Sequence, residues 1–199
     1  MDEKITYFGY GSLVNDATRH DQSVAVRGTL RGYVREWRIA GQTPRGRVCG
    51  LTASPKAGTD IKGVMVIDSA DRLGELDQRE WRYDRHGLHD EAFEAHNDDH
   101  GHPVTDPFVY RCKDEHYRWG DDDHPIIQTY VDCVLKGYLD HFGEAGVHHF
   151  IDTTDGWQTP IWADRQTPFY ARAMSIDPEE LRYFDEVLTA IGVRYMTNR

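Results

Sequence analysis

Short apolar runs in the first third of the chain, each ended by glycine or charged residues, predict β-strands. Val, Ile, Tyr and Phe dominate these runs, as is typical of strands, and Gly, Asp and Pro separate them. One similar run returns near the middle of the chain. We expect strands at residues 5–10, 24–30, 33–40, 61–67 and 108–112, the second and third of which can also form one long strand bent around Gly32.

Three segments have the spacing of amphipathic helices. One covers residues 70–79 and begins at Asp68 or Ser69, either of which can act as an N-cap. The clearest covers residues 126–142, where apolar residues repeat at intervals of three and four. The third starts with an Asp-Pro pair at 177–178, which suits a first helical turn. Its expected buried residues are Leu181, Phe184, Leu188 and Ile191.

The order of these elements indicates the class of fold. Strands come early and long helices come late, which predicts an α+β fold built on a mixed or closed sheet. The 199 residues fit a single domain of ordinary size, and the sequence contains no internal repeat or low-complexity linker. We therefore expect one domain over residues 1–199, with an acidic, histidine-rich excursion at about 86–124 and a C-terminal helical extension.

The net charge of −11 excludes several classes of partner. A phosphate backbone or an anionic membrane surface is held by clustered Lys and Arg, so we expect neither nucleic-acid nor membrane binding. The surplus lies mostly in residues 90–124, with 11 acidic and 3 basic side chains, whereas residues 1–66 carry 6 acidic and 10 basic ones. Three widely spaced cysteines and a charged N-terminus predict a cytoplasmic protein without a signal peptide.

The histidines of the acidic segment raise the alternative of a metal site. His86 and His89 are three residues apart and would share the face of a helix, and His96, His100 or His102 could add a ligand. The surrounding sequence is typical of turns, however, and it contains no established metal-binding spacing. We expect a solvated loop and no metal.

A glycine turn follows the first expected strand, in the sequence FGYGSLV. It matches neither a dinucleotide-binding fingerprint nor a nucleophile elbow, because Val14 stands where each motif requires glycine. Gly9 and Gly11 allow positive φ and close approach to the backbone. The amides of Gly11, Ser12 and Leu13 can converge on an anion if a short helix starts there. The alternative is a tight turn that binds nothing.

Glu80 lies at the end of the helix expected over residues 70–79, next to Trp81 and Tyr83. A carboxylate against aromatic surface is poorly solvated, which raises its pKa toward the range useful for proton transfer. Glu80 is therefore a candidate general base. The alternative is an ordinary surface ion pair with Arg79, Arg82 or Arg85.

Taken together, three stretches of residues 5–85 resemble the γ-glutamylcyclotransferase-like superfamily, which includes γ-glutamylcyclotransferases, ChaC-type enzymes and AIG2-like proteins. They are FGYGSL, then GTLRGYVREW, then KGVMVIDSADRLGELDQRE, which ends in an LDxxE motif. The resemblance implies a small mixed β-barrel flanked by helices. Residues 90–124 and the tail after residue 143 have no clear counterpart in the shortest members.

The resemblance also implies a substrate pocket. Glu80 would be the catalytic glutamate, and weaker candidates for the pocket walls are Tyr83, Tyr110 and Tyr130. The cradle for the γ-glutamyl group would be Tyr7, Phe8, Gly9, Tyr10, Gly11, Ser12 and Leu13.

The implied reaction is release of 5-oxoproline from a γ-glutamyl amide or peptide, with Glu80 as general acid and base. The partner is then a small γ-glutamyl substrate, no cofactor is needed, and the protein is a monomer or homodimer. The alternative is a non-catalytic AIG2-like module that binds a small anionic ligand or a protein partner.

Overall fold

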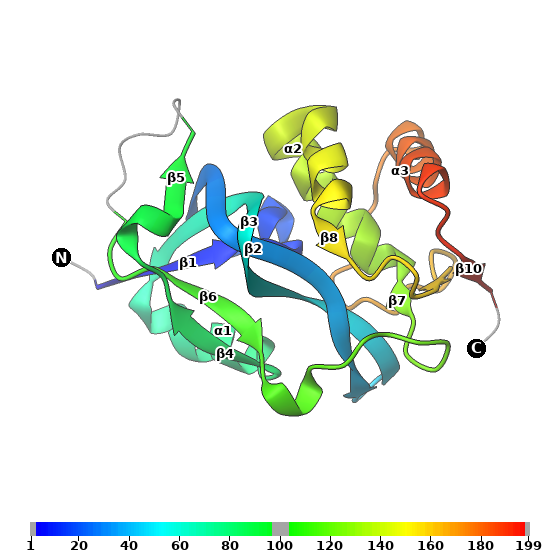
Figure 1. Ribbon diagram of the computed structural model, residues 1–199, viewed down its shortest axis with the longest axis horizontal. Coiled ribbons are helices and arrows are strands. Elements are labelled where there is room, and N and C mark those ends of the chain that lie inside the picture. Colours follow the sequence, from blue (N-terminus) through cyan, green and yellow to red (C-terminus); the bar gives the residue numbers. More distant parts are fainter. Residues whose placement is uncertain (1–2, 97–103, 198–199) are drawn as a thin grey trace.

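The computed structural model describes residues 3–96 and 104–197, and it is built around one long hairpin. Its strands, β2 (Val24–Thr43) and β3 (Gly46–Ser69), run across the molecule, with α1 on one side and α2 and α3 at the other end (Figure 1). The remaining strands are β1 (Lys4–Gly9), β4 (Tyr83–Gly87), β5 (Phe93–Ala95), β6 (Phe108–Cys112), β7 (Ile126–Ile127), β8 (Thr154–Asp155), β9 (Ile161–Trp162) and β10 (Tyr195–Met196). The helices are η1 (Ser12–Val14), η2 (Asp16–Thr18), η3 (Ala70–Arg72), α1 (Leu73–Arg79), η4 (Asp90–Ala92), η5 (Asp114–His116), α2 (Gln128–Asp152) and α3 (Pro178–Ala190).

The sheet is mixed, as the sequence predicts for this α+β chain. β1 pairs antiparallel with β3 and parallel with β6, and β4 pairs antiparallel with β6. β4 and β6 then curl back onto the first half of β3. The Tyr83 hydroxyl donates to the Leu51 carbonyl at 2.8 Å, and the Cys112 amide donates to Thr52 Oγ1 at 3.0 Å. These two bonds hold β4 and β6 against the first half of β3.

The hairpin is longer than the sequence pattern predicts. The two strands expected at 24–30 and 33–40 are one strand, with a register shift between Arg31 and Tyr33 and a positive φ of 75° at Gly32. Residues 46–60 continue β3, although no strand is expected there, because Pro55 and the glycines resemble a loop. Pairing with β2 along the hairpin overrides this local signal.

The three expected helices are present, with different boundaries and one different buried position. Ile126 and Ile127 pair with other strands as β7, so α2 starts at Gln128, and it continues past a kink at Gly143. Asp177 caps α3 by accepting the Glu179 amide at 2.7 Å. The expectation that Ile191 is buried is wrong, because it follows the last turn of α3 and is 41% exposed.

The acidic, histidine-rich stretch at 86–124 contributes to the sheet. It contains β5, which pairs with β2, and β6, which lies beside β1. Residues 121–123 form an exposed turn closed by the Asp121–His124 bridge, as expected for that part of the stretch. Residues 97–103 lie outside the described residues.

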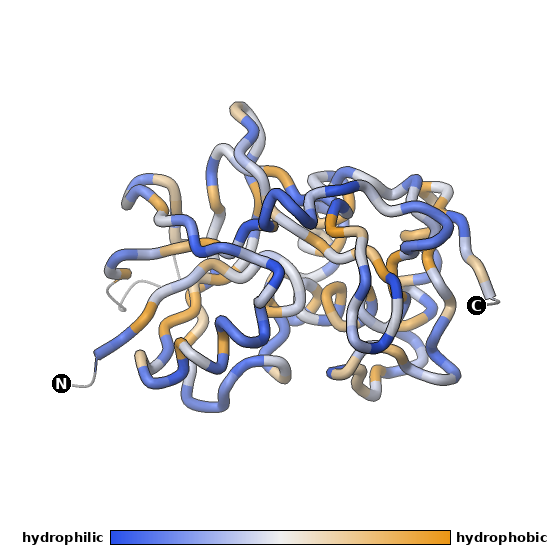
Figure 2. The backbone as a smooth tube through the Cα atoms, turned by 90° about the horizontal axis from the view of Figure 1, so that it is seen from below, coloured by the Kyte–Doolittle hydropathy of each residue, from blue (hydrophilic) through white to orange (hydrophobic). Residues whose placement is uncertain are grey.

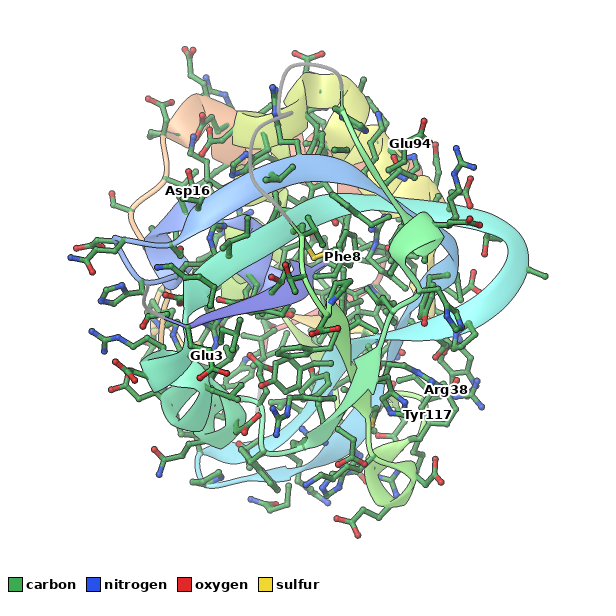
Figure 3. The ribbon with its side chains drawn as sticks, turned by 90° about the vertical axis from the view of Figure 1, so that its left-hand side faces the viewer. Glu3, Phe8, Asp16, Arg38, Glu94 and Tyr117 are labelled. Atoms are coloured by element: carbon green, nitrogen blue, oxygen red, sulfur yellow. The ribbon has the colours of Figure 1, made fainter. Side chains whose placement is uncertain are left out.

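One continuous hydrophobic core joins the strands to the last helix. It extends from Tyr7 and Phe8 of β1 to Phe184 and Leu188 of α3. Phe8 lies in the middle of the molecule, whereas Asp16 and Glu94 lie at its surface (Figure 3). Hydrophobic stretches follow the inner strands, and several outer turns are hydrophilic (Figure 2). Within residues 3–96 and 104–197, no helix has the length and apolarity needed to cross a bilayer.

His149 of α2 gives the fold a predicted pH dependence. Its Nε2 accepts the Lys62 amide at 3.0 Å, and burial, helped by the charges of Arg35 and Lys62, lowers its pKa from 6.5 to about 4. Between these values the unfolded chain binds a proton that the folded chain does not, so stability decreases as pH falls. We expect the urea midpoint to fall more between pH 7 and pH 5 in wild type than in His149→Gln. Equal decreases in the two proteins would contradict this assignment.

Candidate active site

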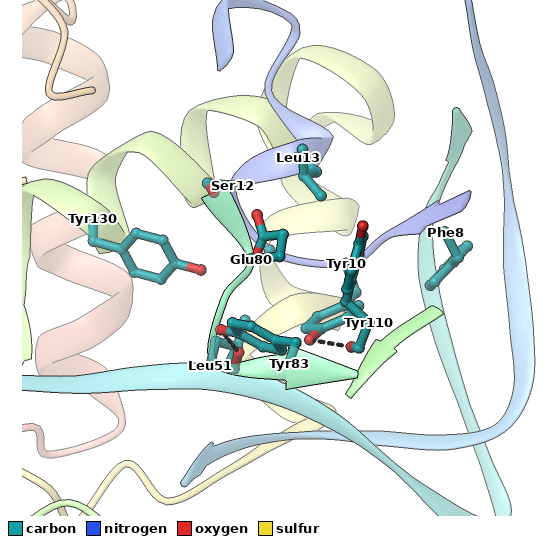
Figure 4. A pocket seen from close by; sticks show the side chains of 10 residues that line it. Phe8, Tyr10, Ser12, Leu13, Leu51, Glu80, Tyr83, Tyr110 and Tyr130 are labelled. Atoms are coloured by element: carbon teal, nitrogen blue, oxygen red, sulfur yellow. Dashed lines mark hydrogen bonds between the residues drawn. The ribbon is translucent and has the colours of Figure 1, made fainter. Parts of the chain in front are cut away.

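A narrow pocket opens where the end of β1, the end of α1 and the start of α2 meet (Figure 4). The space between its walls, including the open mouth, is about 300 Å³. Glu80 is the carboxylate on these walls, within the described part of the chain. The lining residues are Phe8, Tyr10, Gly11, Ser12, Leu13, Leu51, Glu80, Tyr83, Tyr110 and Tyr130.

Glu80 is held in place by the end of α1. It is the residue at which this helix stops, and its amide donates to the Leu76 carbonyl at 2.9 Å. Its carbonyl then accepts the Tyr83 amide at 2.8 Å, which forms the turn into β4. Leu76 is buried in the core and fixes the helix, so the Glu80 backbone has little freedom.

The carboxylate of Glu80 forms an ion pair with the preceding residue. Arg79 Nε lies 3.0 Å from Glu80 Oε1, and the two side chains are only 13% and 15% exposed. The same guanidinium donates to the Thr18 carbonyl at 2.7 Å and to Ser12 Oγ at 3.2 Å. Glu80 therefore has a feature from each of the two hypotheses: its carboxylate is paired with Arg79, and it is also largely buried.

Opposing effects act on the acidity of Glu80. Burial is the largest, and it raises the pKa of Glu80 above its ordinary value of 4.5. The positive charges of Arg79 and Arg172 act in the opposite direction but do not cancel it. A carboxyl group with a raised pKa can accept and return a proton near neutral pH more readily than a solvated one.

Four tyrosines surround the carboxylate. The hydroxyl of Tyr10 donates to the Tyr110 carbonyl at 2.8 Å, that of Tyr83 to the Leu51 carbonyl at 2.8 Å, and that of Tyr110 to Asp77 at 2.6 Å. The Tyr130 hydroxyl points into the pocket toward Glu80 (Figure 4). Burial raises the pKa of all four, so they remain neutral hydrogen-bonding groups. Among the residues that line the pocket, Glu80 is therefore the candidate for proton transfer.

The glycine turn works through close approach rather than through positive φ. Neither Gly9 nor Gly11 has a positive φ, which corrects one of the two reasons expected for them. A Cβ on Gly11 would lie 2.8 Å from the Tyr130 hydroxyl, so a side chain there would fill the pocket. The short helix η1 begins at the next residue, as the anion-binding hypothesis requires.

The remaining candidate residues lie outside the pocket. Successive side chains along a strand point to opposite faces of the sheet, so Tyr7 of β1 faces away from the pocket that Phe8 lines. Gly9 packs against Leu13, where a Cβ would lie 2.9 Å from the Leu13 Cβ. Trp81, expected to desolvate Glu80, is 46% exposed and contacts His116 instead.

Sequence reasoning missed the contribution of the 163–176 segment, which links β9 to α3. Tyr170 packs edge-to-face on Tyr130 with ring centroids 5.1 Å apart, and Arg172 is close enough for its charge to act on Glu80. Leu51 of β3 was missed as well, because its half of the hairpin resembles a loop. No local motif marks these residues, since contacts between distant parts of the chain bring them to the pocket.

The described histidines of the proposed metal site, His86, His89 and His96, do not form a cluster. His86 is in β4 and His89 precedes η4, so the two share no helical face, and His96 Nε2 lies 3.2 Å from Thr29 Oγ1. Over residues 3–96 and 104–197, no three His, Cys, Asp or Glu side chains are placed to hold a metal ion. His100 and His102 lie outside the described residues.

Comparison with known proteins identifies the fold. No protein-family model matches the chain. No curated protein matches its sequence. The comparison with solved structures shows that the chain has the γ-glutamyl cyclotransferase fold, as the sequence resemblance implies.

Three structures illustrate this likeness. One described as a γ-glutamyl cyclotransferase has a TM-score of 0.57 and 12% identity, with 92% of this chain and 99% of that one covered. An uncharacterized protein from Homo sapiens has a TM-score of 0.57 and 13% sequence identity, with 94% of this chain and 99% of that one covered. YkqA from Bacillus subtilis gives 0.54 and 19%, with 77% of this chain and 56% of that one covered. At these identities the likeness establishes the fold alone.

Proposed function

We propose that the protein is a γ-glutamyl cyclotransferase, with Glu80 as the general acid and base. The observation that carries this proposal is the largely buried carboxylate of Glu80, which has a raised pKa and faces an aromatic pocket beside a glycine turn. The fold shared with a γ-glutamyl cyclotransferase adds support.

The reaction is an intramolecular acyl transfer. The substrate's α-amino nitrogen attacks its own γ-carbonyl carbon, a new C–N bond closes the five-membered ring, and the bond to the leaving nitrogen breaks. Glu80 accepts a proton from the attacking nitrogen and delivers one to the leaving nitrogen, so the products are 5-oxoproline and a free amine. No water is consumed. Holding the substrate in a folded conformation supplies much of the acceleration.

The glycine turn would bind the charged part of the substrate. The first N–H groups of a helix have no acceptor within that helix, and η1 begins at Ser12 beside the pocket. The amides of Ser12 and Leu13 would donate hydrogen bonds either to the oxyanion that develops on the γ-carbonyl or to the α-carboxylate. The neutral Tyr130 hydroxyl, which lies over Gly11, would add a further donor.

The direct test is product analysis. Purified protein is incubated with γ-glutamyl amino acids, glutathione and γ-glutamylamines, and 5-oxoproline is measured by mass spectrometry. Release from at least one substrate supports the proposal. Binding of these compounds without release would instead favour the non-catalytic module.

Arg79 gives this proposal a pH signature. Its positive charge lowers the pKa of Glu80, so Arg79→Gln is expected to raise that pKa. Because the base must be deprotonated, the acid limb of the kcat/KM profile should move to higher pH in the variant. Arg182→Gln, at an α3 position where the side chain is 65% exposed, is the control and should keep the wild-type limb. A limb that stays in place in Arg79→Gln would contradict the assignment of Glu80 as the base.

A further inference from the structure

The 163–176 segment is anchored at its start to the helix that carries part of the pocket wall. At its start, the carboxylate of Asp164, which is 3% exposed, accepts the Thr129 amide at 2.8 Å and the Phe169 amide at 2.7 Å. Arg165 follows and forms two 2.7 Å bonds with Asp132 of α2. These contacts join the segment to the first turns of α2, the helix that carries Tyr130.

The middle of the segment contacts one wall of the pocket and the chain just after the glycine turn. Tyr170 packs on Tyr130, and the Asn15 amide group donates to the Met174 sulfur at 3.4 Å, just beyond the glycine turn. Between these contacts, the Ala173 amide donates to the Tyr170 carbonyl at 3.1 Å and forms a turn. Arg172 lies within this turn, so its backbone is held beside the pocket.

The Arg172 side chain lines a basic cleft next to the pocket. The cleft encloses about 610 Å³, including its open mouth. Arg19, Arg72 and Arg79 also line it, together with the carboxylates of Asp68 and Glu75. Arg79 separates the cleft from the pocket, because one guanidinium reaches both Glu80 and the Thr18 carbonyl. A group that extends a short distance beyond Glu80 would therefore meet this cleft.

Arg172 differs from Arg72 and Arg79 in having no hydrogen-bond or ion-pair partner among the described residues. Arg72 binds Glu75 at 2.9 Å and His20 at 2.8 Å, and Arg79 binds Glu80. In the described part of the chain, no hydrogen bond or ion pair holds the Arg172 guanidinium, although its charge lowers the pKa of Glu80. Its charge is available to an anion that comes close to the reacting atoms.

We propose that Arg172 is a specificity-determining residue that binds a carboxylate on the leaving group. The inference rests on the proposed function. In a γ-glutamyl amino acid, the carboxylate carbon of the leaving group lies about 3 to 3.7 Å from the scissile carbonyl carbon. That carboxylate would approach the negative charge of Glu80, and Arg79 is already engaged by Glu80. The cation of Arg172 offsets this repulsion, so leaving groups that carry a carboxylate are favoured over simple amines.

A matched pair of substrates tests this role. γ-Glutamylethylamide is γ-glutamylalanine without the leaving-group carboxylate, so the ratio of their kcat/KM values isolates that group. In Arg172→Gln the ratio of alanine to ethylamide is expected to fall about 10- to 100-fold, the effect of losing a charged hydrogen bond. Arg172→Lys should restore part of the ratio. Arg182→Gln, at an exposed α3 position that does not line the cleft, should keep the wild-type ratio.

The possible failures are distinguishable. If both substrates lose the same factor in Arg172→Gln, Arg172 acts on the part that they share, and the inference is overturned. If neither substrate is affected in Arg172→Gln, the inference is also overturned, while the proposed function stands. If wild-type protein releases 5-oxoproline from neither substrate nor any other γ-glutamyl compound, the proposed function itself fails.

Discussion

Replacing Glu80 with Gln is expected to lower the rate of 5-oxoproline release by about 10²- to 10⁴-fold. The amide keeps the shape of the side chain, but it cannot accept a proton from the substrate's α-amino group near neutral pH. The ring-closing attack then proceeds without a base, while the pocket still holds the substrate in its folded conformation. The loss should therefore appear mainly in kcat, measured as 5-oxoproline formed by the purified variant.

The design needs a control for folding and for charge. Glu179→Gln removes a carboxylate of α3 that is 86% exposed, and it should retain wild-type activity. Far-UV circular dichroism and urea unfolding of both variants would show whether Glu80→Gln keeps the native fold. A correctly folded Glu80→Gln protein with wild-type turnover would remove Glu80 from the mechanism.

Features that depend on neighbours in sequence could be predicted. β1 follows from a short apolar run that ends at a glycine turn, and the start of α3 follows from the Asp177 cap. The helix end at Glu80 is likewise a local property, although its neighbour Trp81, expected to desolvate it, is exposed. In each case the signal and the structure it produces lie within about ten residues of one another.

Features that depend on long-range pairing could not be predicted. Residues 46–55 form a strand because each of them pairs with a residue of β2. Ile126 and Ile127 continue the apolar spacing of the following helix, but pairing with β3 and β9 draws them into the sheet. Arg172 is about 90 residues from Glu80 in sequence, and the anchors at Asp164 and Arg165 are what place it there.

The basic residues of the N-terminal part also have a different role from the one their charge suggests. Residues 1–66 carry a net positive charge, which favours a pocket for carboxylates. The cations that act on Glu80, however, are Arg79 and Arg172, which lie outside that stretch. Arg35, the most deeply buried basic residue of the stretch, binds the Lys62 carbonyl and the Tyr138 hydroxyl and serves the core. A segment's net charge therefore does not locate its charged groups in space.

Gly137→Ala is expected to destabilise the protein by about 1–3 kcal/mol, although alanine is the better helix former. Gly137 lies inside α2 where the chain after the glycine turn crosses the helix. An added Cβ would lie 2.6 Å from the Asn15 nitrogen and 2.8 Å from its Cα. These are backbone atoms, so the clash cannot be relieved by rotating a side chain. The gain in helix propensity, about 1 kcal/mol, is smaller than the expected cost of overpacking.

A glycine-to-alanine substitution at Gly74 should instead raise the free energy of unfolding. Gly74 is inside α1, has an ordinary helical φ, and has no atoms within 4 Å of the position where a Cβ would be added. Gly74→Ala should therefore stabilise the protein by about 0.5–1 kcal/mol. Urea unfolding of the two variants measures both effects. Because Asn15 also bonds the Cys133 carbonyl at 2.8 Å, moving it should shift η1 and reduce activity in Gly137→Ala. If both variants were stabilised equally, the close packing of α2 against the glycine turn would be incorrect.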